Sequence, residues 1–182
     1  MNLKTVRFGC IAAALAALLL LSSCEEGTSS TDTSVPADFS SVDMMTAVLP
    51  ADGLAEYMLA NVSFDDPNLI KMEAEIAESL YNVGGLAESV ASYGSGGATA
   101  EAILVLKCAD AEKAAAAAER IDKYRTEMAE IYASYNQPES VKLTKALLAQ
   151  DGVYVVFCVS PDSAFAEDVY QAYVLETVFA EK

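Results

Sequence analysis

The chain is 182 residues long, has no histidine, and carries a formal net charge of −16 with 53% hydrophobic residues. This acidity excludes nucleic-acid binding by phosphate neutralisation, and the lack of histidine excludes Ser-His-Asp and Cys-His catalysis and histidine-based zinc sites. We therefore expect no catalytic residues, no metal site, no cofactor and no nucleic-acid partner.

The N-terminus has the pattern of a lipoprotein signal. Lys4 and Arg7 precede an apolar run from residue 8 to residue 21, which is shorter than the roughly 20 apolar residues of a membrane span. Two small serines then precede Cys24, whose thiol can carry a diacylglycerol. We predict that residues 1–23 are removed and that Cys24 is lipidated, because two acyl chains give stable anchoring. The alternative is a shortened membrane anchor in which Cys24 has no such role.

The predicted signal is followed by a tether and one domain. Residues 24–38 are polar, rich in Ser, Thr and acids, and favour a flexible tether. Residues 39–182 have the length of one domain. Removal of Lys4 and Arg7 would lower the net charge from −16 to −18. We expect an acidic domain tethered to the extracytoplasmic face of the cell membrane, with the membrane as its partner through Cys24.

Helical patterns come first along the chain. The sequence favours helices over residues 40–49, before Pro50, and over residues 54–61. Asp66-Pro67 has the form of a helix cap followed by proline in the first turn, which predicts a third helix over residues 67–83.

Two hairpins follow, each with a helix after it. Strands are expected at residues 86–93 and 99–109 around a Gly-rich turn, and at 141–150 and 153–160 around Asp151-Gly152. Asp110 should cap a helix to about residue 135, and Ser160-Pro161-Asp162 should open the last one. The fold class is α+β: N-terminal helices, then a β-β-α-β-β-α unit forming a four-stranded antiparallel sheet with helices on one face.

The open face of this sheet is the candidate binding surface. Alternation along the second strand places Glu101, Ile103, Val105 and Lys107 on one face. The same alternation places Ser140 and Lys142 together at a solvated edge.

Other residues leave two interpretations open. Cys108 and Cys158 can form a disulfide or serve as small buried hydrophobes. The helix from Asp110 has an alanine-rich first half that allows close approach to a sheet, and tyrosines further along. Those tyrosines and two near the C-terminus can pack in the core or surround a ligand cleft: Tyr124, Tyr132, Tyr135, Tyr170 and Tyr173.

The C-terminal half also carries a resemblance. A small-residue loop leads into Thr99-Ala100-Glu101, an apolar run ends at Ala109-Asp110, and the last hairpin continues through Gly152-Val153-Tyr154. In their order and spacing these motifs resemble a family of uncharacterised lipoprotein domains of Gram-positive bacteria, over roughly residues 40–180. The resemblance implies a lipid-anchored, extracytoplasmic α+β domain and no particular activity.

The functional expectation is a non-enzymatic binding or envelope-assembly module whose partner is an envelope protein or a ligand. Two alternatives stay open. One is a hydrolase that uses two carboxylates without histidine, and the other is a lipoprotein that binds a small ligand.

Overall fold

The computed structural model describes residues 50–97 and 99–180, and the side chains of this part up to residue 176. The predicted signal, the tether with Cys24 and the helix expected at residues 40–49 lie outside the described residues.

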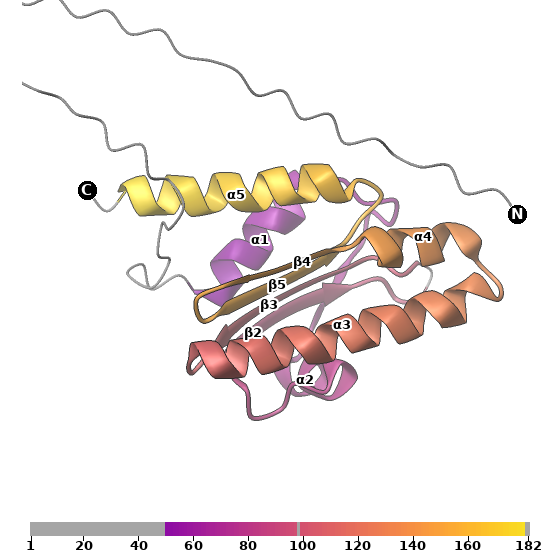
Figure 1. Cartoon of the computed structure of the whole chain (residues 1–182). Coiled ribbons are helices and arrows are strands. Elements are labelled where there is room, and N and C mark those ends of the chain that lie inside the picture. The colour runs from indigo at the N-terminus through magenta and orange to yellow at the C-terminus, as the bar shows by residue number, and fades with distance from the viewer. Residues whose placement is uncertain (1–49, 98, 181–182) are drawn as a thin grey trace, which may run out of the picture. The chain divides into compact units, whose positions relative to one another are not determined.

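A five-stranded antiparallel sheet forms the middle of three layers (Figure 1). Its strand order is β1-β2-β3-β5-β4. The strands are β1 (Ile70–Met72), β2 (Ala87–Gly94), β3 (Ala102–Cys108), β4 (Leu147–Asp151) and β5 (Tyr154–Val159). The helices are α1 (Ala51–Asn61), α2 (Ala74–Tyr81), α3 (Ala111–Ala133), α4 (Gln137–Lys145) and α5 (Ser163–Ala180).

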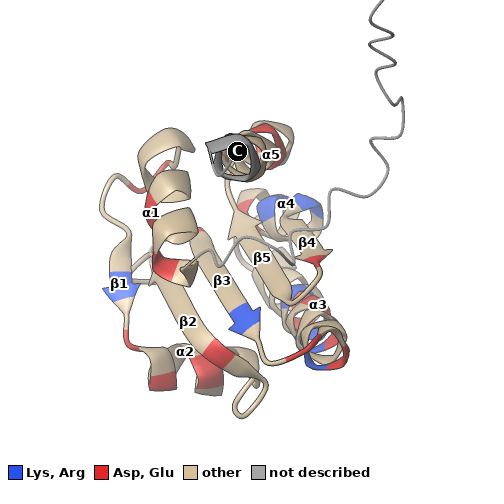
Figure 2. Ribbon diagram, turned by 90° about the vertical axis from the view of Figure 1, so that its left-hand side faces the viewer, with Lys and Arg blue, Asp and Glu red and all other residues tan. Residues whose placement is uncertain are grey.

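Both faces of the sheet are covered, which corrects the prediction of four strands with helices on one face. The fifth strand, β1, pairs with β2 at the edge. Helices α1 and α5 pack on one face, and α2, α3 and α4 pack on the other (Figures 1 and 2). The central strands β3 and β5 are buried on both sides, so their sequences are almost continuously apolar.

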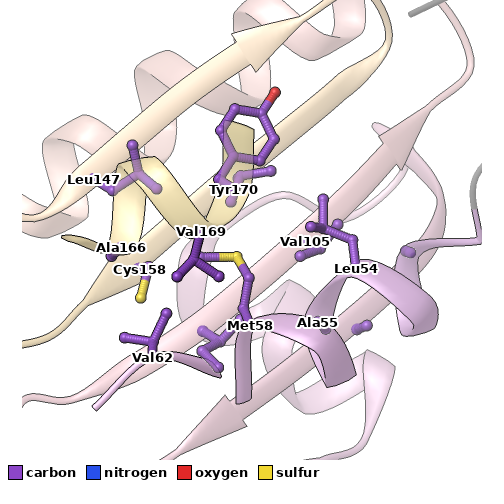
Figure 3. Packing of buried hydrophobic residues seen from close by; sticks show 14 of the residues in the cluster. Leu54, Ala55, Met58, Val62, Val105, Leu147, Cys158, Ala166, Val169 and Tyr170 are labelled. Carbon is purple, nitrogen blue, oxygen red and sulfur yellow. The ribbon is translucent and has the colours of Figure 1, made fainter. Parts of the chain in front are cut away.

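The predicted open face is the one beneath α1 and α5. Leu54 and Met58 of α1 and Val169 of α5 pack against it (Figure 3). Ile103 and Val105 are completely buried in this layer, so the prediction that this face is open to a partner is wrong. The physical reason is that apolar stripes on both terminal helices need a hydrophobic surface to cover.

The turn signals and helix caps are largely confirmed. Both predicted hairpins form, β2 with β3 and β4 with β5. Asp110 caps α3 by accepting a hydrogen bond from the Lys113 backbone N–H at 2.7 Å. Gly152 has a φ of +54°, the left-handed conformation that the Asp151-Gly152 turn requires.

Two segments differ from the prediction, and both begin at a proline. After Asp66-Pro67 the chain forms a turn and then β1, and α2 begins only at Ala74. Pro138 lies in the first turn of α4, so residues expected to begin a strand form a helix and only β4 is extended. Glu139 in the first turn and Lys142 in the last turn suit this short helix, because they complement its dipole.

The two described cysteines are buried free thiols on opposite faces of the sheet. Cys158 packs in the layer of α1 and α5, whereas Cys108 packs in the layer of α2, α3 and α4. A disulfide needs Cα atoms within about 7 Å and side chains that point toward each other, so this fold does not pair them. None of the described helices is long and apolar enough to span a membrane.

We predict that neither buried thiol reacts with a thiol reagent at pH 8 while the protein is folded. Burial raises the pKa of Cys158 to about 12 and that of Cys108 to about 11, and the thiolate is the reactive form. Labelling followed by mass spectrometry should modify both only after denaturant is added. The variant Cys108→Ser should lose one denaturant-dependent modification. Recovery of a peptide crosslinked through Cys108 and Cys158 from the native protein would contradict the fold.

Candidate functional site

Four side chains from three parts of the chain meet at one end of the sheet. Lys142 Nζ of α4 lies 2.7 Å from Asp65 Oδ2, 3.0 Å from Glu101 Oε1 and 2.9 Å from Glu139 Oε1. Glu101 comes directly before β3, and Asp65 belongs to the loop between α1 and β1. We call Asp65, Glu101, Glu139 and Lys142 the Lys142 cluster.

The cluster is mostly withdrawn from water. The side chains of Glu101, Glu139 and Lys142 are 0%, 8% and 10% exposed, whereas that of Asp65 is 64% exposed. Burial opposes a charge on Lys142, but the hydrogen bonds that its ammonium donates to Asp65, Glu139 and Glu101 outweigh this effect and raise the pKa of Lys142. The ammonium therefore stays protonated at neutral pH and holds the three carboxyl groups together.

Backbone N–H groups complete the cluster. The Glu101 carboxylate accepts hydrogen bonds from the N–H groups of Asp65 at 2.9 Å and Asp66 at 2.8 Å. Glu139 Oε2 accepts one from the Ala100 N–H at 2.8 Å. These bonds compensate a site that holds more carboxyl groups than ammonium groups. They also fix the loop before β1, the start of β3 and the start of α4 relative to one another.

A cleft of about 160 Å³ opens beside this cluster, between α2, α3 and the loop that joins β2 to β3. Glu101, Ser95 and Thr99 form its polar end. Its walls are mostly apolar or aromatic side chains: Met72, Leu80, Tyr81, Tyr124, Met128 and Tyr132. We call this the tyrosine cleft.

Contacts between the rings and the loop hold the cleft in shape. Tyr81 and Tyr124 meet edge to face with ring centroids 4.7 Å apart. Burial raises the pKa of Tyr81, and the nearby Tyr124 adds to the effect, so the phenol is neutral. The carbonyl of Thr99 accepts hydrogen bonds from the hydroxyls of Ser95 and Tyr132, the latter at 3.4 Å. Ring contacts thus hold the walls of the cleft, and hydrogen bonds hold its polar end.

The model of a family described as a domain of unknown function, DUF4358, matches residues 63–160, more than half of the chain. The chain belongs to this DUF4358 family. No curated protein and no solved structure matches it. The matched range contains the Lys142 cluster and the tyrosine cleft in full, whereas α1 and α5 lie outside it.

The fold separates the four residues of the binding surface that the sequence predicted. Glu101 belongs to the Lys142 cluster and lines the cleft. Ile103 and Val105 lie in the core under α1 and α5, and Lys107 is half-buried at the far end of β3. They do not form a joint surface. Ser140 and Lys142 lie on a helix and not on a strand edge.

The five tyrosines singled out in the sequence also lie in different parts of the fold. Tyr124 and Tyr132 line the cleft, while Tyr170 and Tyr173 pack in the opposite layer and Tyr135 is exposed. The sequence interpretation missed the roles of Glu139 and Lys142. The signal that could have revealed them is the Glu–Lys spacing of three residues after Pro138, which is typical of a helical ion pair.

The variant Lys142→Met should destabilise the domain by about 3 kcal/mol or more, because it leaves buried carboxyl groups without their ammonium partner. Urea unfolding followed by circular dichroism measures this. Lys145→Met is the matched control, since Lys145 is an exposed lysine of the same helix, and it should change stability by about 0.5 kcal/mol at most. Equal effects of the two variants would show that the cluster does not stabilise the fold.

Proposed function

We propose that this chain is a lipid-anchored, extracytoplasmic binding module that holds a small ligand in the tyrosine cleft. The observation that carries the proposal is the cleft itself, a concave, aromatic-lined site with one polar end fixed by the Lys142 cluster. Small-molecule sites combine these features: apolar walls and a few placed polar groups. The binding role expected at the sheet face therefore moves to the opposite layer.

The contacts of Glu101 favour binding over catalysis. Among the described residues that line the cleft, Glu101 is the one acid. Hydrolysis by two carboxylates needs a second one about 5–10 Å away on the other side of the substrate bond. Glu139 faces Lys142 and the Ala100 N–H instead. The two-carboxylate hydrolase therefore gains no support from this site, and we propose a non-enzymatic role.

The anchor rests on the sequence before residue 39. A tether of about 15 residues has a typical end-to-end distance of roughly 20 Å, so the cleft would remain near the bilayer. The acidic domain would be repelled by anionic lipids within about 8 Å at physiological salt. We infer that the domain stands off the membrane and samples ligands in the adjacent space.

Lipidation predicts that Cys24→Ala abolishes both lipid labelling and the removal of residues 1–23. The wild-type chain should incorporate labelled palmitate and sediment with membranes, whereas the variant should incorporate none and should keep the residue 1–23 segment. Cys108→Ser is the control and should behave as wild type, because Cys108 is buried in the folded domain. A Cys24→Ala chain that is still processed and still lipid-labelled would overturn the anchor.

Ligand binding in the cleft can be followed through methionine methyl groups. Met72 and Met128 line the cleft, whereas Met58 is buried in the opposite layer and serves as an internal control. The full-length protein in micelles would be titrated with choline, with its uncharged carbon analogue neohexanol and with pivalate, and its methyl NMR signals would be recorded. At least one of the first two should shift the Met72 and Met128 signals and leave Met58 unchanged. If no probe shifts them selectively, the cleft is not a small-ligand site and the proposal fails.

A further inference from the structure

The tyrosine cleft has an electron-rich lining. The described residues that line it include three tyrosines, two methionines and one glutamate, and no lysine or arginine. The faces of aromatic rings carry negative electrostatic potential and attract cations. A phosphate or carboxylate ligand would meet no opposite charge there, so the lining favours a cationic or neutral occupant.

The hydrogen-bond acceptors at the polar end are already occupied. Both oxygens of Glu101 accept backbone N–H groups, and one also contacts Lys142. The Thr99 carbonyl accepts two hydroxyls. A primary ammonium has three donors that need acceptors when it leaves water. A quaternary ammonium has no N–H donors, so it needs only an aromatic, electron-rich environment.

We propose that the tyrosine cleft binds a small quaternary ammonium group. This inference rests on the proposed function, since it names the ligand class of the same site. The charged group would lie against Tyr81, Tyr124 and Tyr132, with Glu101 behind it. Methionine sulfur and leucine side chains would contact its methyl groups.

The surrounding charges support a cation. The Lys142 cluster behind Glu101 contains three carboxyl groups and one ammonium. A smaller groove next to the cleft is lined by Arg120 and Lys123, but both have partners. Arg120 donates to the Asn82 carbonyl at 2.7 Å, and Lys123 pairs with Glu127. The net charge of −16 also concentrates cations near the protein.

The size of the cleft limits the ligand. Sites for drug-sized molecules have volumes of about 300–1,000 Å³, and this cleft has about 160 Å³. It accommodates a trimethylammonium group with a short substituent and excludes a large polycation. Choline, which has this form, is therefore the natural probe.

The test compares choline with neohexanol, which has its size and shape, and with ethanolamine, which has its charge, by methyl NMR titration and calorimetry. Choline should bind at least about tenfold more tightly than neohexanol, which has the same shape without the charge, because only choline makes cation–aromatic contacts. Choline should also bind more tightly than ethanolamine, which lacks the methyl groups and whose primary ammonium finds the Glu101 and Thr99 acceptors at the polar end already occupied. Equal binding of choline and neohexanol would overturn the inference that the ligand is a cation. Tighter binding of ethanolamine than of choline would overturn the preference for a quaternary ammonium.

Substitution of the cleft wall gives a second, independent readout. Tyr124→Leu removes an aromatic face and should weaken choline binding about tenfold, whereas Tyr124→Phe keeps the ring and should bind like wild type. Tyr173→Leu is the matched control, because Tyr173 packs against Tyr57 in the opposite layer. Loss of binding in Tyr124→Phe, or no loss in Tyr124→Leu with its thermal unfolding unchanged, would contradict a cation–aromatic site.

Different results would overturn the small-ligand site and the quaternary ammonium site. If neohexanol shifts Met72 and Met128 as strongly as choline, the cleft remains a ligand site and only the quaternary ammonium assignment is lost. If choline, neohexanol, ethanolamine and pivalate all leave these methyl signals unchanged, the cleft binds no small ligand of this size and both proposals are lost.

Discussion

The buried carboxylate of Glu101 at the start of β3 is the constraint on which the surrounding structure depends. A carboxylate withdrawn from water is strongly unfavourable unless a cation and hydrogen-bond donors surround it. Lys142 supplies the cation, and the loop before β1 supplies two N–H groups. These requirements draw α4 and that loop to the end of the sheet. They also explain why the segment after Asp66-Pro67 leads into an edge strand and does not continue a helix.

The shape of α3 explains why a cleft exists next to this cluster. Ala114 and Ala117 in its first half are completely buried, which brings that half close to the sheet. Larger residues follow in the second half, where Tyr124 and Met128 are only partly buried. The helix therefore stands further from the sheet at that end, and the space is lined by its tyrosines and by Tyr81 of α2. Side-chain size along one helix thus determines where the domain is hollow.

Local signals in the sequence predicted the hairpins, the Asp110 cap and the graded packing of α3, because a few adjacent residues determine each of them. Two features of the fold depend on residues far apart in the sequence and could not be predicted in this way. The same apolar pattern fits a sheet covered on one face or on two, and only the full set of helices shows that α1 and α5 cover the second. Likewise, Glu101 and Lys142 are 41 residues apart. No short window reveals that an acid just before a strand and a lysine in a helix form one buried pair.

The way in which the Lys142 cluster satisfies its own groups decides what the adjacent cleft can do. A general acid or base must exchange a proton with its substrate, which requires an oxygen within hydrogen-bond reach of the reacting atom. Glu101 instead uses both oxygens to hold the protein together. These bonds already fix its position, so the polar end of the cleft needs no reorganisation when a ligand arrives. A pre-oriented negative charge without free acceptors suits a ligand that carries positive charge without free donors. In the function that we propose, the same contacts leave Glu101 to fix one end of the cleft, while the aromatic lining attracts the cation.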